Sequence, residues 1–320
     1  MAHVIPGWRR GRRRISAISL LLVLSVLLGG CRPSGERRLV SLREGEFSGG
    51  EVAGQLLYVE TRGVRQSALF VHDLDRDERQ RLTLPPGYAN SPAWSPDGRH
   101  VAFSLTGADG FSHLWVVPVA GGRARQITDG EVVDDHPRWS PDGEKLVFTS
   151  IRDGDYDWRL FTVAVDDPEP PRPVGSTDGH SVFPDWSPDG RHLVYANRGE
   201  GNYRLRLHDL ESGRDRRITD GPGEDLYPRF SPDGREVLFS STRVDDVWQI
   251  QRLDLATDEV EHVVGSDSMD EFPVYSPDMQ HVAFSAGHLA LYRADGEAFP
   301  DGKLRWSITR NLAWTPDWRG

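Results

Sequence analysis

The sequence predicts an all-β fold, a six-bladed β-propeller whose C-terminal strand closes the first blade. Three observations predict it. A unit of the form Trp-Ser-Pro-Asp-Gly recurs, and its Pro-Asp pairs begin at positions 96, 141, 188, 232, 277 and 316. Successive copies are therefore 45, 47, 44, 45 and 39 residues apart, and a period of roughly 40–50 residues is typical of repeat architectures. Each period accommodates four short strands, and no stretch shows helical periodicity, which favours a propeller.

Each copy predicts a β-hairpin. In the copy at 137–148, Trp139 ends one strand, Pro141 presets φ for the turn, Asp142 caps it and Gly143 takes a positive φ. Alternating apolar residues such as those at 146 and 148 then predict the second strand. The glycine is repeated in three other copies, whereas the fifth has a methionine: Gly98, Gly190, Gly234 and Met279.

The remaining strands follow in order within each period. Third strands are predicted at Leu114–Val119, Leu160–Val165, Leu205–Leu210 and Ile250–Leu255, and short fourth strands at Arg125–Thr128 and Arg216–Thr219.

The first blade lacks a hairpin of its own. Its predicted strands are Gln55–Glu60, Ala68–Leu74 and Arg79–Leu84. We expect Asn311–Asp317 to supply the missing strand, because an open ring would leave an unpaired strand edge on each side of the gap.

The repeat Pro-x-Trp-Ser-Pro-Asp-Gly, followed by an apolar strand and Ser/Thr-x-Arg, resembles the propeller of the TolB family, a WD40-like repeat fold. The resemblance covers residues 54–318. TolB is the periplasmic component of the Tol–Pal envelope system, so the resemblance implies an envelope protein that binds other proteins. TolB also carries an α/β domain before its propeller, for which this sequence leaves no room, so its role is not expected to transfer whole.

Residues 1–31 predict an export signal. Five arginines precede the apolar run Ile15–Leu28, and Leu28-Gly29-Gly30-Cys31 resembles the lipobox of bacterial lipoproteins. Cys31, the single cysteine, is then expected to carry the lipid, with 32–53 as a tether and 54–320 as the propeller. Because Arg32 follows Cys31, the predicted address is the outer membrane, facing the periplasm. The paired arginines leave both the general and the twin-arginine export routes open.

Charge limits the partners. The chain carries −11, and removing five arginines with the signal leaves about −16. Such acidity argues against nucleic acid as a partner and against electrostatic adhesion to anionic lipid, leaving the lipid anchor as the membrane attachment.

Catalytic motifs are scarce. The sequence contains no His-Glu-x-x-His, no Gly-x-Ser-x-Gly and no phosphate-binding glycine loop. Asp153, Asp155 and Asp157 alternate, but the twelfth position of an EF-hand counted from Asp153 is Ala164, so a solvated hairpin tip is favoured over a calcium site. No cofactor and no metal site is predicted.

The predicted binding site is the mouth of the ring, because innermost propeller strands line the central channel. Its residues stand just before the hairpin units of separate blades. They are Asp134, Asp135, His136, Phe183, Tyr227, Asp270, Glu271 and Phe272. A hydrated loop face is an equally weighted reading. If the site exists, its acidity favours a basic segment of an envelope protein.

The favoured function is therefore a non-catalytic, lipid-anchored binding or scaffolding module. The alternative is a periplasmic carbohydrate-active enzyme, because TolB-like repeats also occur in pectic-oligosaccharide lyases that hold a metal with histidines. Such a site needs several converging histidines, and only His136 and His180 are expected near the mouth.

Overall fold

The computed structural model describes residues 52–61, 66–152, 157–167, 169–199, 201–264, 269–295, 305–309 and 313–320. They lie in one compact unit, Glu44–Gly320. The predicted signal, Cys31 and nearly all of the tether lie outside the described residues, as does most of the loop at 153–157. Within the described ranges, no helix is long and apolar enough to cross a membrane.

Strands make up the regular structure of this unit, and they fall into six groups in chain order. The first three groups are β1 (Gln55–Thr61), β2 (Ser67–Asp73) and β3 (Glu78–Arg81); β4 (Tyr88–Trp94), β5 (His100–Thr106), β6 (Ser112–Pro118) and β7 (Arg125–Gln126); and β8 (Val133–Trp139), β9 (Lys145–Ile151), β10 (Arg159–Ala164) and β11 (Arg172–Val174).

The last three groups follow the same plan. They are β12 (His180–Trp186), β13 (His192–Arg198), β14 (Arg204–Asp209) and β15 (Asp215–Arg217); β16 (Asp225–Phe230), β17 (Glu236–Ser241), β18 (Gln249–Asp254) and β19 (Val260–Val264); and β20 (Glu271–Tyr275), β21 (His281–Ser285), β22 (Leu289–Arg293) and β23 (Arg305–Ser307), followed by β24 (Ala313–Arg319).

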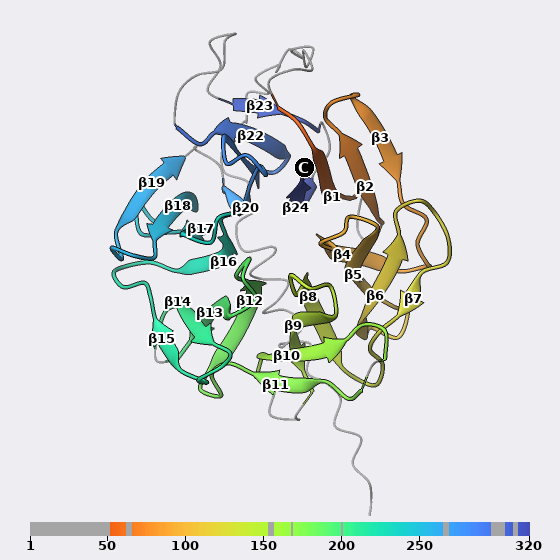
Figure 1. Cartoon of the computed structure of the whole chain (residues 1–320), viewed down its shortest axis with the longest axis horizontal. Coiled ribbons are helices and arrows are strands. Elements are labelled where there is room, and N and C mark those ends of the chain that lie inside the picture. Colours follow the sequence, from red (N-terminus) through yellow and green to blue (C-terminus); the bar gives the residue numbers. More distant parts are fainter. Residues whose placement is uncertain are drawn as a thin grey trace, which may run out of the picture. The chain divides into compact units, whose positions relative to one another are not determined.

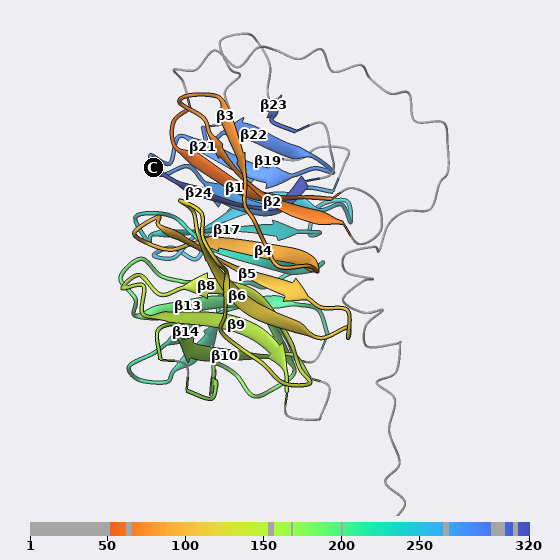
Figure 2. The ribbon, with the colours of Figure 1, turned by 90° about the vertical axis from the view of Figure 1, so that its right-hand side faces the viewer.

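The groups form antiparallel blades arranged around a centre (Figure 1). Within a blade the strands pair in chain order, with β4, β8, β12, β16, β20 and β24 innermost. A single parallel bridge, Ser112 with Val133, joins the second and third blades. Turned by 90°, the view shows β4 and β5 running across the thickness of the ring (Figure 2). The predicted all-β propeller is confirmed.

The C-terminal strand closes the first blade, as predicted. β24 pairs with β1 in an antiparallel register in which Gln55 lies opposite Arg319 and Glu60 opposite Ala313. The innermost strands contact one another around the circle, and β24 contacts both β20 and β4. Closure therefore removes the free edge that β1 would otherwise present.

The second strand of each blade is buried on both faces. Phe103, Phe148, Tyr195 and Phe239 are fully buried, and so are the residues beside them, such as Ala102 and Val147. The alternating apolar residues predicted these strands, and the residues between them are buried as well, because each blade packs between two neighbours. The hydrophobic core consists of these layers between blades.

The repeated turn is built by its own side chains. In the third blade, Ser140 Oγ donates to Asp142 Oδ1 at 2.5 Å and accepts from the Lys145 amide at 2.9 Å. Asp142 also accepts from the Glu144 amide, and these bonds lower the pKa of Asp142. Gly143 has φ of 75° and Met279, at the equivalent position, 61°. The predicted positive φ is confirmed for all four turn glycines.

Every innermost strand contains a β-bulge at its Xaa-Pro pair. In β8, Asp135 lies opposite Thr149 but Arg138 lies opposite Val147, so the strand carries one extra residue. Proline fits there because it has no amide hydrogen to leave unpaired. The residue before each proline has φ between 48° and 56°; these residues are Ser91, His136, Phe183, Tyr227, Phe272 and Thr315.

Candidate binding site at the mouth of the ring

Five of the six bulges place side chains around one pocket with about 330 Å³ of unfilled space, part of it open to solvent, here called the mouth pocket. Its lining comes from β8, β12, β16, β20 and β24. It consists of rings from the positions before four prolines, two arginines from the positions after two of them, and prolines themselves. Because equivalent positions beside the proline of successive repeats line the pocket, residues far apart in the chain converge here.

Four rings form a continuous stack, which we call the aromatic arc: His136, Phe183, Tyr227 and Phe272. Neighbouring ring centroids are 4.4, 4.4 and 4.0 Å apart in that order. The His136–Phe183 contact is edge-on and the other two are tilted, which are favourable arrangements for aromatic pairs. In the two remaining blades the same position holds a hydroxyl residue, so the arc covers one side of the mouth.

Below the arc, charged side chains from the positions after the prolines form the ion cluster, which consists of Arg138, Asp185, Arg229 and Asp317. Arg229 Nη2 donates to Asp317 Oδ1 at 2.5 Å, and its Nε lies 3.5 Å from Asp185. Each aspartate also accepts from a backbone amide of the next blade: Asp317 from Trp94 at 2.7 Å and Asp185 from Phe230 at 2.9 Å. The cluster thus ties four blades together.

The two arginines are not equally neutralised. Burial by itself would lower the pKa of Arg229, but the Asp317 and Asp185 carboxylates outweigh burial and raise the pKa of Arg229. Arg138 lies 3.9 Å from Asp185, and its Nη1 donates to the carbonyls of Pro92 and Pro137. Burial, together with the Arg229 guanidinium, lowers the pKa of Arg138 to about 10. Arg138 is therefore the less closely paired of the two arginines.

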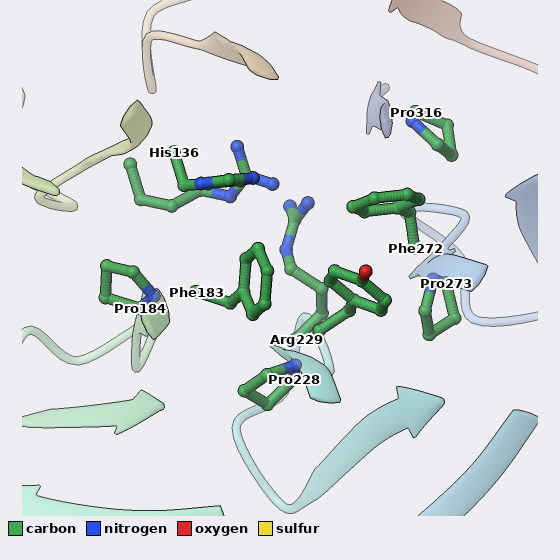
Figure 3. A pocket seen from close by; sticks show the side chains of 10 residues that line it. His136, Phe183, Pro184, Pro228, Arg229, Phe272, Pro273 and Pro316 are labelled. Carbon is green, nitrogen blue, oxygen red and sulfur yellow. The ribbon is translucent and has the colours of Figure 1, made fainter. Parts of the chain in front are cut away.

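The close-up of the pocket shows Arg229 extending between Phe183 on one side and Phe272 on the other (Figure 3). The rings of Pro184, Pro228 and Pro273 lie around them. His136 Nε2 and the Tyr227 hydroxyl are buried and have no hydrogen-bond partner among the described residues. Such atoms are costly to leave unsatisfied, and a bound group can satisfy them.

The structure divides the predicted site residues into two classes. His136, Phe183, Tyr227 and Phe272 line the mouth pocket, whereas Asp134, Asp135, Asp270 and Glu271 do not. Asp134 and Asp270 are fully buried, so the expectation that they form an acidic mouth does not hold. Asp134 accepts from Ser150 Oγ and Arg152 Nη2, both at 2.6 Å.

The buried aspartates explain part of the repeat. Asp225 repeats the arrangement of Asp134, with Ser241 Oγ at 2.6 Å and Arg243 at 2.8 Å. The Ser-x-Arg part of the repeat therefore neutralises an aspartate of the innermost strand. Asp135 likewise accepts from Ser104 Oγ, at 2.7 Å. These carboxylates hold strands together, and the ionisable lining of the pocket is cationic instead.

Glu271 stands apart from the other acids. Burial, with the Asp270 carboxylate, raises the pKa of Glu271 to about 7, although the nearby Tyr227 hydroxyl opposes the shift. Its Oε1 is buried without a hydrogen-bond partner among the described residues. A carboxyl that keeps its proton to a higher pH than usual therefore lies beside the arc.

Sequence reasoning missed the ion cluster and Trp248, whose ring centroid lies 6.3 Å from that of Tyr227. A signal for the cluster was present, because four of the six positions after the proline hold Arg or Asp. His180, expected near the mouth, is not part of the pocket lining; its Nε2 lies 3.4 Å from Asp157. In the described part of the chain, no group of three or more His, Cys, Asp or Glu is placed to hold a metal ion.

The family model of the TolB beta propeller domain matches residues 52–172 and 162–295, which together span most of the chain. The chain belongs to the TolB β-propeller family. Because the matched residues include the inner strands β4, β8, β12, β16 and β20, the aromatic arc lies within the TolB-type repeats.

Solved structures agree on the TolB fold. TolB from Acinetobacter baumannii is 19% identical, with a TM-score of 0.72 over 96% of this chain and 73% of that one. A putative TolB from Agrobacterium tumefaciens is 19% identical, with a TM-score of 0.64 over 85% of this chain and all of that one. An oligogalacturonate lyase in complex with manganese is 16% identical, with a TM-score of 0.56 over 76% of this chain and 71% of that one. These likenesses establish the fold alone.

An uncharacterized protein of Agrobacterium fabrum is 33% identical over 82 residues. The alignment covers 26% of this chain and 28% of that protein.

Proposed function

We propose that this TolB-family propeller is a non-catalytic binding module of the cell envelope, and that the mouth pocket holds a peptide segment of a partner protein. The observation that carries the proposal is the aromatic arc: four rings from four blades face one pocket at centroid spacings of 4.0–4.4 Å. Positive φ occurs at all six bulges, so the bulge belongs to the fold. Ring side chains occupy four of these six positions.

The physical case rests on what the arc offers a partner. Aromatic side chains in a largely desolvated pocket supply much of the energy of protein interfaces. Tyr227 is 3% exposed and Phe272 8% exposed, so the arc is held rigidly and loses little entropy when a partner binds. The unsatisfied His136 Nε2 and Tyr227 hydroxyl add polar groups that fix the orientation of a bound segment.

The test compares the double variant Tyr227→Ala with Phe272→Ala against the exposed-site control Arg214→Ala. Partner capture from envelope extract, with mass-spectrometric identification, and thermal melting are measured for each. We expect the double variant to lose a partner that both wild type and control retain, since truncating one such anchor typically costs about 2 kcal/mol or more. Tyr227→Phe, which keeps the ring, distinguishes lost contacts from lost stability. Equal capture by the double variant and the control would place the binding surface elsewhere.

The second candidate, a carbohydrate-active enzyme working at the mouth, is supported by the fold likeness to oligogalacturonate lyases. Of the residues that line the pocket, one is a histidine, His136. We therefore prefer the binding role. Incubation with oligogalacturonate and Mn²⁺ tests the alternative, because release of unsaturated sugar products by wild type but not by His136→Ala would favour the enzyme.

For location, we propose a lipid anchor at Cys31 on the outer membrane, facing the periplasm. The lipobox-like Leu28-Gly29-Gly30-Cys31 supports it, and two or more acyl chains anchor a protein stably. Mass spectrometry is expected to find acyl mass on wild type, and Cys31→Ser is expected to appear in the soluble fraction. Wild-type protein without acyl mass would overturn the anchor.

A further inference from the structure

The charge of the mouth pocket differs from the acidic character of the whole chain. Its lining residues include two arginines and no Asp or Glu. The two carboxylates behind them are engaged mainly by Arg229, with Asp317 at 2.5 Å and Asp185 at 3.5 Å. The charged side chains that line the pocket are therefore arginines, in a protein of net charge −11.

Arg138 is the residue of this region that lacks a close carboxylate. Its nearest ion-pair contact in the described ranges is Asp185 at 3.9 Å, beyond hydrogen-bond distance. Its side chain is nevertheless 13% exposed, and burial with the neighbouring Arg229 lowers the pKa of Arg138. A buried guanidinium of this kind binds an anion more strongly than a solvent-exposed guanidinium does, because charge-assisted hydrogen bonds strengthen in a low dielectric.

We propose that the mouth pocket recognises one acidic side chain, Asp or Glu, of the partner's peptide segment, and that the Arg138 guanidinium binds its carboxylate. This deepens the proposed function and rests on it. The aromatic arc contacts the aliphatic part of the segment beside the carboxylate, while the Arg229–Asp317 pair blocks the pocket below. A side chain suits such a space better than backbone, because four rings line one side of the pocket and Arg229 extends between two of them.

The Tyr227 hydroxyl is a second donor at the pocket. It belongs to a side chain that is 3% exposed and lines the pocket, and the Glu271 carboxyl lies near it, yet no group in the described part of the chain is within hydrogen-bond distance of it. A carboxylate accepts hydrogen bonds from several donors at once. One carboxylate can therefore accept hydrogen bonds from both the Arg138 guanidinium and the Tyr227 hydroxyl. A basic side chain would instead be repelled by Arg138.

The probe is a set of capped five-residue peptide pools, acetylated and amidated, with degenerate flanks and a central Glu, Asp, Gln or Lys. Each pool is passed over the immobilised protein, and retention is measured by mass spectrometry. We expect the Glu and Asp pools to be retained about tenfold or more over the Gln pool, the range of a hydrogen bond to a charged group. Arg138→Met is expected to abolish the preference, and the matched exposed variant Arg214→Met to leave it intact.

A measurement on wild type keeps the proposal falsifiable if Arg138→Met does not fold. The Nε–H resonance of Arg138 is expected to shift on adding the Glu pool but not the Gln pool. Retained pools with equal affinity for every central residue would overturn the carboxylate assignment and leave the binding function standing, whereas retention of no pool would overturn both. A Gln pool with a free C-terminus that binds through Arg138 would show that the chain end, not a side chain, is recognised.

Discussion

Arg229 and Asp317 lie 88 residues apart in the chain and meet at the centre of the ring, with Nη2 and Oδ1 separated by 2.5 Å. Asp317 belongs to the strand that closes the first blade, and it also accepts from the Trp94 amide of the second blade. One carboxylate therefore connects the closing strand to a neighbouring blade and to a blade across the ring.

The first prediction concerns this ion pair. Asp317→Asn keeps an acceptor for the Trp94 amide but removes the charge, leaving Arg229 buried with Asp185 alone. We expect a loss of about 3–5 kcal/mol in the free energy of unfolding, because an uncompensated buried charge is costly. Urea denaturation measures the loss.

The matched control is Asp258→Asn, which breaks the exposed pair that Asp258 forms with Arg216 at 3.3 Å. Exposed pairs contribute about 0–1 kcal/mol, so this variant is expected to unfold almost as wild type does. Similar losses at the two sites would contradict the structural role of the Arg229–Asp317 pair.

The second prediction concerns closure. Deleting residues 311–320 removes β24, leaves one edge of β1 unpaired and takes Trp318 out of the core that it shares with Leu56. We expect aggregation or loss of cooperative melting, measured by calorimetry, because every blade packs on two others. Deleting Gly320 alone is the control. A truncated protein that melts as sharply as the full chain, and at the same temperature, would refute the closure model.

The third prediction concerns the turns. A Cβ built on Gly143 would lie 3.8 Å from its nearest neighbour, the Pro96 ring, so space is not the obstacle. Its φ of 75° is the obstacle, and Gly143→Val is expected to cost about 1–2 kcal/mol. Met279→Val is expected to cost less, because Met279 already holds a side chain at φ of 61°. Equal changes in melting temperature would argue against a shared turn geometry.

The fourth prediction concerns pH. Because the pKa of Glu271 is raised to about 7, the folded protein keeps a proton that the unfolded chain releases near its ordinary value of 4.5. Stability is therefore lost as pH rises from about 4.5 to 7, and the full cost is present above 7. Glu271→Gln removes this cost. We therefore expect the free energy of unfolding of the variant to exceed that of wild type by on the order of 2–3 kcal/mol at pH 8 and by almost nothing at pH 4.

Chemical denaturation of both proteins at pH 4, 6 and 8 measures the difference, with the exposed Glu131→Gln as control. A difference between Glu271→Gln and wild type that stays constant over this range would show that Glu271 titrates normally in the folded state.

Part of the candidate site was predictable from the sequence. The rings before Pro137, Pro184, Pro228 and Pro273 were expected at the mouth from their position in the repeat, and they line the pocket. The acids beside them were also placed there, but the pocket lining excludes them. Successive residues of a strand point to opposite faces, and the bulge inserts one extra residue. That extra residue decides which side chains point to the centre of the ring, and the sequence pattern did not reveal it.

The sequence by itself determined the number of blades, the turn that starts five of them and the strand that closes the ring, because these depend on local residue preferences repeated at a fixed period. Only the tertiary structure decided which charged side chains meet at the centre of the ring. Arg138, Asp185, Arg229 and Asp317 come from four blades, and their pairing depends on distances across the ring. Electrostatic interactions weaken with distance, strengthen with burial and do not depend on sequence separation, so an acidic chain can place two arginines at the mouth of its ring.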